Sequence, residues 1–159
     1  MRNWNSLWAL AAFVAICLAV AGSGAIVTGR SVSHWYPTLR KPSWNPPAWV
    51  FGPVWTALYL MMATAAWLVW QRRGFESIRG ALGLFAFQLA LNAAWSPLFF
   101  GLKDAFAGFL DIVPLWAAIL ATLVSFWKIS PAAGWLLAPY WLWVSFAAGL
   151  NFAIWRMNR

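Results

Sequence analysis

Residues 6–27 read SLWALAAFVAICLAVAGSGAIV, an apolar run without a charged side chain. Stretches of about 20 such residues are long enough to cross a bilayer as a helix. Further stretches of the same character follow at about residues 48–70, 80–101, 106–127 and 133–155. The sequence therefore predicts an all-α integral membrane bundle of five transmembrane helices, which forms a single domain over residues 1–159.

The composition of the whole chain favours lipid as its main solvent. Of the 159 residues, 64% are hydrophobic and 9% are charged, whereas soluble domains carry about 25% charged residues. The net charge of +8 is spread over short loops and the two ends of the chain. We therefore expect the lipid bilayer as a partner and no nucleic acid. The Lys and Arg residues divide almost evenly between the two sides, so the positive-inside rule assigns no orientation.

The first apolar stretch has a second interpretation as a secretory signal. Arg2 precedes it, and small residues follow at AGSGA. Its apolar run is longer than the usual signal core, so we expect an uncleaved helix. Cys17 lies within this stretch and allows no intramolecular disulfide, because it is the only cysteine.

The connection between the first two stretches is long and unusual in composition. The run His34–Trp55, HWYPTLRKPSWNPPAWVFGPVW, is dense in Trp and Pro and carries cations. Loops beyond about 12–15 residues are usually functional or disordered, and disordered segments are poor in aromatic residues. The prolines also restrict the backbone. We therefore expect an ordered loop that packs on one end of the bundle as a lid or wall for a flat apolar ligand.

Polar residues and tryptophans inside the stretches indicate what the loop covers. Gln88 and Asn92 are one helical turn apart and share a face; Asn92 either orients a ligand or joins helices by hydrogen bonds. Interfacial anchoring explains the Trp residues at the ends of the stretches. It explains less well the deeper ones, which are suited to stacking on flat ligands: Trp55, Trp95, Trp116 and Trp143.

Conventional catalysis and metal binding are disfavoured. The chain has one His, one Cys and three acidic residues, without a pair of carboxylates or a metal-ligand spacing. We therefore expect no metal site and no required cofactor. Small residues recur every four positions in three of the stretches, which permits close helix contacts in lipid. The stripe Ala86, Ala90 and Ala94 is our candidate face for a homodimer.

Several segments resemble one known family, the translocator proteins, also called tryptophan-rich sensory proteins or peripheral benzodiazepine receptors. The run WYPTLRKPSWNPPAWVFGPVWTALY resembles its signature. QLALNAAWSPLFFG, FAGFLDIVPLW and GWLLAPYWLWVSFAAGLN resemble its third, fourth and fifth helices. The resemblance covers nearly the whole chain at matching spacing.

The resemblance implies a five-helix bundle whose long first loop caps a ligand pocket, usually as a homodimer. It implies binding of porphyrins (protoporphyrin IX and haem) and, in some members, of benzodiazepine-type drugs and cholesterol. It also implies regulation of tetrapyrrole levels and stress responses in bacterial members, so we expect a bacterial source. The implied pocket residues are Trp35, Tyr36, Trp44, Pro47, Trp55, Asn92, Trp95, Phe99, Trp143, Phe146, Ala147 and Leu150.

Function remains open among three classes. The chain is a membrane receptor or sensor for tetrapyrroles, a transporter of porphyrin or sterol, or an agent of light- and oxygen-dependent porphyrin breakdown, for which Trp55 and Trp143 match the implicated tryptophans. Sterol binding is in doubt because Leu150, Phe152 and Arg156 occupy the cholesterol motif without its Tyr. As a separate hypothesis, Arg30, Arg40 or Lys41 pairs with porphyrin propionates.

Overall fold

The computed structural model describes residues 2–72 and 75–159; the side chains of residues 2–4, 30 and 75–77 lie outside this description. The described residues form helices and connecting loops, without a strand. Five of the helices are long and apolar enough to cross a membrane, as predicted. Their bounds are α1 Arg2–Val32, α2 Ala48–Trp70, α3 Phe75–Ser96, α4 Ala105–Ile129 and α5 Pro131–Met157.

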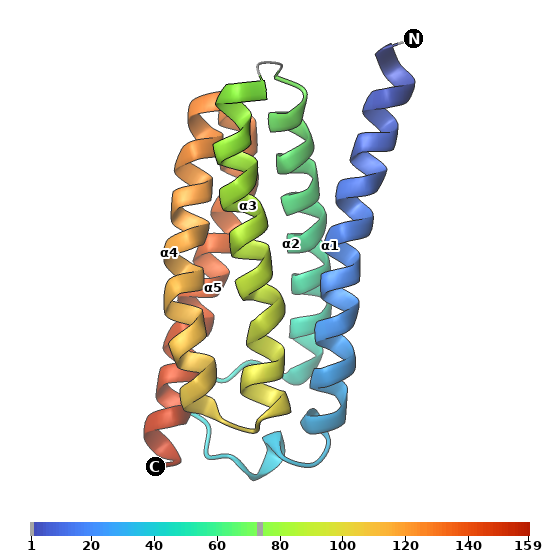
Figure 1. Ribbon diagram of the computed structural model, residues 1–159. Helices are drawn as coiled ribbons and strands as arrows, with labels where there is room; N and C mark the ends of the chain where they lie inside the picture. Colours follow the sequence, from blue (N-terminus) through green and yellow to red (C-terminus); the bar gives the residue numbers. More distant parts are fainter. Residues whose placement is uncertain (1, 73–74) are drawn as a thin grey trace.

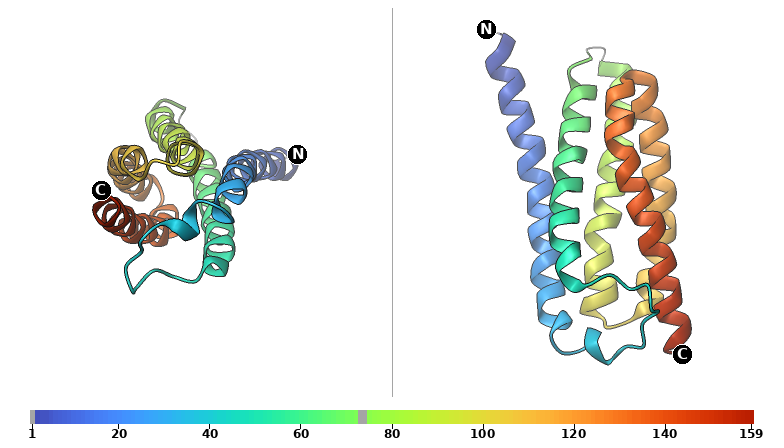
Figure 2. Two further views of the ribbon diagram at one scale, coloured as in Figure 1. Left: turned by 90° about the horizontal axis from the view of Figure 1, so that it is seen from below. Right: turned by 180° about the vertical axis from the view of Figure 1, so that it is seen from behind.

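The five helices stand side by side, and the two ends of the chain lie at opposite ends of the bundle (Figure 1). Seen along its axis, the bundle is a ring in which the neighbours follow the order α1, α2, α5, α4, α3 (Figure 2, left). This order places α1 between α2 and α3, and places α5 between α2 and α4. Helices that are distant in the sequence thus enclose one interior space.

Helix α1 is longer than the predicted stretch, which ended at Val27, and so the first loop is shorter. Polar side chains of the added turn contact residues at the end of α3 and in the segment that follows it. Ser31 Oγ donates a hydrogen bond to the carbonyl of Phe100 at 2.7 Å, and Thr28 Oγ1 lies 3.4 Å from Ser96 Oγ. Residue 30 therefore lies in helix α1 rather than in the loop.

The first loop, residues 33–47, crosses the end of the bundle towards α5 and returns to the start of α2 (Figures 1 and 2). It contains one short 3-10 helix, η1, Tyr36–Thr38. Pro47 then precedes α2 in an extended conformation. The loop therefore caps the end of the ring, as the sequence predicts.

Helix α3 ends in a π-helical turn, η2, Pro97–Gly101. A π turn changes the direction in which successive side chains point, and here two consecutive residues, Phe99 and Phe100, are both buried. After it, Lys103 adopts a positive φ of 56°. Asp104 caps α4, because its Oδ1 accepts hydrogen bonds from the backbone N–H groups of Phe106 and Ala107 at 2.8 and 3.2 Å.

Candidate ligand cavity

A cavity of about 660 Å³ lies inside the ring, at the end that the first loop covers. Its walls come from α1, α2, α3 and α5, with Ile112 and Leu115 contributed by α4. Pockets for small molecules and cofactors measure about 300–1,000 Å³ and are mostly apolar. The size and position of this cavity therefore make it the candidate functional site.

Most of the residues that the family resemblance implies lie around this cavity. Its lining includes Tyr36, Trp55, Asn92, Trp95, Phe99, Trp143, Ala147 and Leu150. They come from five separate segments, so only the folded bundle brings them together. Three large indoles, from α2, α3 and α5, thus border one space, although they are distant in the sequence.

The other implied residues form a layer outside the cavity wall. Trp35 packs edge-on against Phe99, with ring centroids 5.6 Å apart. Trp44 packs against Phe146 at 5.7 Å, and Phe146 in turn packs against Trp143 at 5.5 Å. Pro47 lies directly before α2. The loop tryptophans therefore support the residues that line the cavity and do not line it themselves.

A buried hydrogen-bond network holds Asn92 in place. Tyr59 Oη donates to Asn92 Oδ1 at 2.5 Å, and Asn92 Nδ2 donates to Tyr140 Oη at 2.6 Å. Tyr140 Oη donates to Gln88 Oε1 at 3.0 Å. The network joins α2, α3 and α5 at the wall of the cavity, which Tyr59 and Asn92 line. The helix-joining role that the sequence left open for Asn92 is thus present, while Asn92 also borders the cavity.

The tryptophan N–H groups around the cavity differ in their bonding. Trp95 Nε1 donates to Asn151 Oδ1 at 3.2 Å, and Asn151 Nδ2 donates to the carbonyl of Ala105 at 2.7 Å. By contrast, Trp143 Nε1 is buried without a hydrogen-bond partner among the described residues. Buried polar groups are usually satisfied, so this N–H is a candidate donor to a bound ligand.

The loop-side cover of the cavity is fixed by polar contacts of Tyr36. Its hydroxyl donates to Asn45 Oδ1 at 2.9 Å, and its carbonyl accepts from Lys41 Nζ at 2.6 Å. Lys41 Nζ also bonds the carbonyl of Leu39 and lies over the Tyr36 ring. Burial raises the pKa of Tyr36, and the bond to Asn45 opposes this in part, so the phenol is neutral at physiological pH.

Two of the proposed propionate partners, Arg40 and Lys41, do not line the cavity. Arg40 is exposed, and its backbone N–H and carbonyl bond the Asn158 side chain, each at 2.9 Å. Lys41 bonds the loop carbonyls described above. The side chain of Arg30 lies outside the described residues. Propionate pairing stays a prediction. Lys41 contacts Tyr36, which lines the cavity.

Sequence reasoning missed the contribution of α1. Eight of its described residues line the cavity: Leu18, Ala21, Gly22, Gly24, Ala25, Thr28, Gly29 and, at its last position, Val32. The signal was present in the small residues of AGSGA, because Gly and Ala leave room where larger side chains would fill it. Ala11, Ala15 and Ala19, the small residues that recur every four positions in the first stretch, are exposed and do not line the cavity.

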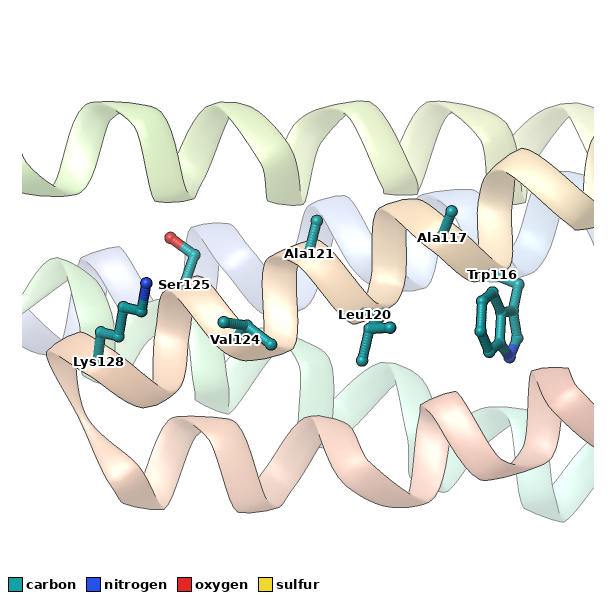
Figure 3. Close-up of a pocket in the computed structure, with 7 residues that line it drawn as sticks. All are labelled: Trp116, Ala117, Leu120, Ala121, Val124, Ser125 and Lys128. Carbon is teal, nitrogen blue, oxygen red and sulfur yellow. The ribbon is translucent and has the colours of Figure 1, made fainter.

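A second hollow lies along α4, whose ribbon runs between those of α3 and α5 in Figure 3. Figure 3 shows its lining side chains rising from this one helix, from Trp116 to Lys128. It is shallow and has no convergent polar groups, so it is no candidate for a small-molecule site.

The predicted dimer face on α3 is partly exposed. Ala86 and Ala90 are exposed, whereas Ala94 is half-buried. Homodimer formation remains a prediction.

The described residues contain no group of three or more His, Cys, Asp or Glu that could hold a metal ion. Asp111 is buried in α4, and its Oδ2 has no hydrogen-bond partner in the described part of the chain. It is absent from the cavity lining. The chemistry available in the cavity is therefore that of aromatic rings and neutral hydrogen-bonding groups.

Comparison with known proteins identifies the family to which this bundle belongs. Residues 13–156 match the TspO/MBR family. The chain belongs to the TspO/MBR family. The tryptophan-rich protein TspO of Chlorobaculum tepidum is 46% identical over 153 residues, which is 94% of this chain and 95% of the relative.

Two other TspO/MBR relatives carry different names. The translocator protein of Sus scrofa is 41% identical over 146 residues, or 88% of this chain and 86% of the relative. The tryptophan-rich sensory protein of Cereibacter sphaeroides is 41% identical over 155 residues, or 97% and 94%. Family membership and five apolar helices identify a multi-pass integral membrane protein. The expected bacterial source stays a prediction, because TspO/MBR relatives also occur in mammals.

Proposed function

We propose that this protein is a membrane receptor or sensor that binds tetrapyrroles, protoporphyrin IX and haem, and thereby regulates porphyrin levels and stress responses. The observation that carries this proposal is the apolar cavity, bordered by Trp55, Trp95 and Trp143 from three helices. Large aromatic faces favour flat ligands through stacking. The same walls suit benzodiazepine-type ligands, which are also apolar and carry aromatic rings.

The cavity residues have different roles in this proposal. Trp95 is fixed by Asn151 and stacks on Phe99, with centroids 5.1 Å apart, so it forms a rigid wall. Trp143 has an N–H without a partner and donates to an acceptor of the ligand. The Tyr59–Asn92–Tyr140 network keeps the inner end of the cavity rigid. A rigid, preformed site binds with a smaller entropic cost.

The cations of the loop would interact with the carboxylates of the porphyrin. Lys41 is held against Tyr36, which lines the cavity at its loop end. Charge-assisted bonds to carboxylates are stronger than neutral ones. We expect the pair of substitutions Arg40→Ala and Lys41→Ala to weaken protoporphyrin IX binding and to leave binding of its dimethyl ester unchanged. Equal affinities of wild type and variant for the free acid would refute this pairing.

Titration of the purified protein with protoporphyrin IX, followed by tryptophan fluorescence and porphyrin absorbance, tests the binding proposal. We expect saturable binding that is weakened at least tenfold by Trp55→Ala or Trp143→Ala. The matched control is Trp135→Ala, because Trp135 is 66% exposed and lies outside the cavity. Binding that is unsaturable, or equal in all four proteins, would contradict a site in this cavity.

Light-dependent breakdown of the porphyrin is a second candidate function. It is favoured by the position of Trp55 and Trp143 on the same cavity, since a photoexcited porphyrin beside an oxidisable indole can start radical chemistry with oxygen. Illumination of the complex in air should then bleach the porphyrin faster than in Trp143→Phe. Bleaching at the rate produced by free tryptophan would exclude a specific reaction.

A further inference from the structure

The exposed part of the cavity wall is confined to two neighbouring helices. Most residues that line the cavity are buried or half-buried. The exposed ones are Leu18, Gly22, Ala25 and Gly29 of α1, together with Ala48, Gly52 and Thr56 of α2. We call these seven residues the α1–α2 seam. Residues that line a cavity and are also exposed mark the place where the cavity meets the outside.

Helical periodicity shows on which side of α1 the seam lies. Its α1 members are spaced by four, three and four residues, so they share one face. The face that meets α3 is different: a Cβ at Gly24 would lie 3.2 Å from Ser96 Oγ, and Thr28 also contacts Ser96. Because α1 stands between α3 and α2 in the ring, the seam faces α2.

Small side chains leave the seam open. A Cβ built at Gly22, Gly29 or Gly52 meets no heavy atom within 4 Å. At about 1.5 Å per residue, Leu18–Gly29 extends over about 16 Å of helix, and Ala48–Thr56 over about 12 Å. The hydrocarbon core of a bilayer is about 30 Å thick. The seam therefore occupies about half of the membrane core, on the side of the first loop.

The end of the cavity that faces water, in contrast, is covered by the first loop. Tyr36 bonds both Asn45 and Lys41 across the loop, and Asn158 holds the loop to the end of α5. No residue in the described lining of the cavity is charged. A ligand that enters from water would have to break these contacts, whereas one dissolved in acyl chains meets uncharged and mostly small residues at the seam.

We propose that the cavity opens sideways into the bilayer between α1 and α2, and that it takes up a membrane-dissolved, largely apolar ligand through this seam. The identity of that ligand as a tetrapyrrole rests on the proposed function, but the route does not. The proposal makes Gly22 and Gly52 the residues that determine the rate of entry.

Closing the seam tests the route. In the double variant Gly22→Leu/Gly52→Leu, each new Cβ meets no heavy atom within 4 Å, so we expect the fold to be retained, which thermal unfolding checks. Its control is Gly149→Leu on α5, where a Cβ also meets nothing within 4 Å and which lies outside the cavity lining. In phosphatidylcholine vesicles, we expect stopped-flow association of protoporphyrin IX to slow at least tenfold in the double variant only. Asn158→Ala, which releases the loop, should leave this rate unchanged.

A labelling experiment that needs no tetrapyrrole tests the same entry route. In a Cys17→Ala background, Ala147→Cys places a thiol on the cavity wall. We expect a membrane-soluble pyrene maleimide to label it faster than a charged, membrane-impermeant maleimide, and the double variant to slow the soluble reagent at least tenfold. Unchanged association and labelling in the double variant, or faster labelling by the charged reagent when the loop is released, would overturn the seam. Absence of porphyrin binding with seam-dependent labelling would refute only the proposed function.

Discussion

The Tyr140 hydroxyl joins the side-chain amides of Asn92 and Gln88 inside the bundle. It accepts a hydrogen bond from Asn92 and donates one to Gln88, and all three side chains are buried. A buried polar group that loses its partner costs more free energy than the bond itself contributes, because no water replaces the partner. The Tyr140 side chain thus affects both the stability of the bundle and the position of Asn92, which lines the cavity.

Tyr140→Phe should destabilise the protein by about 1–3 kcal/mol, since it leaves Asn92 Nδ2 and Gln88 Oε1 without these partners. Tyr59→Phe is the matched comparison, because it removes one bond only, and we expect a smaller loss. The midpoint of thermal unfolding in detergent measures both. A Tyr140→Phe protein as stable as the wild type would show that the network is not a significant source of stability.

Gly108→Ala should also be destabilising, because the new Cβ would lie 2.8 Å from Phe99 Cδ2 and 2.9 Å from Phe99 Cβ. Phe99 is 2% exposed and cannot move freely, so we expect a cost of about 1–3 kcal/mol and weaker ligand binding. Gly149→Ala serves as control and should be neutral or stabilising by up to about 1 kcal/mol. Equal melting temperatures for the two variants would contradict the close packing of α4 on Phe99.

At the scale of elements, the sequence predicted the number, order and type of the helices, and α2 to within a residue of its ends. Periodicity and length suffice for this, because each helix satisfies its own backbone in lipid. The end of α1 was misplaced because Ser31 bonds the carbonyl of Phe100, a contact between residues far apart in the chain. The π-helical turn at Pro97–Gly101 has no local sequence pattern that distinguishes it from an ordinary helix end.

The start of α4 depends on one side chain, Asp104. Asp104→Ala should cost about 0.5–2 kcal/mol, since it removes the acceptor for two N–H groups of the first turn. Asp104→Asn retains an acceptor and should lose less. The effect should reach the cavity, because the carbonyl of Ala105 holds Asn151, which in turn bonds Trp95. Thermal unfolding and protoporphyrin IX affinity that both stay unchanged in Asp104→Ala would refute this linkage.

For the whole molecule, the cavity is a property of the ring and not of any segment. The family resemblance identified eight cavity residues by motif. The α1 residues were missed because several of them are glycines, which line the cavity by leaving space and have no side chain that indicates binding. The loop tryptophans were assigned to the lining because the sequence does not show that Trp44 packs edge-on against Phe146. Such second-layer contacts depend on how the loop crosses the end of the bundle (Figure 2).

The loop is joined to the last helix through Asn158, which bonds the backbone of Arg40 on both sides. Asn158→Ala should release the loop, so that trypsin cleaves the chain after Arg40 at least several times faster than in the wild type. Met157→Ala, an exposed neighbour, is the control. Limited proteolysis followed by mass spectrometry gives the rates. Identical cleavage of both variants would mean that other contacts suffice to hold the loop.

The bond between Arg40 and Asn158 also joins an early and a late part of the polypeptide, which leave the ribosome at different times. Arg40 and the first two helices are synthesised before α5 and Asn158. During membrane insertion the loop therefore remains unlatched, and the cavity lacks its α5 wall, until residues 131–158 have been made. A chain truncated before α5 would accordingly enter the membrane with one wall of the cavity missing.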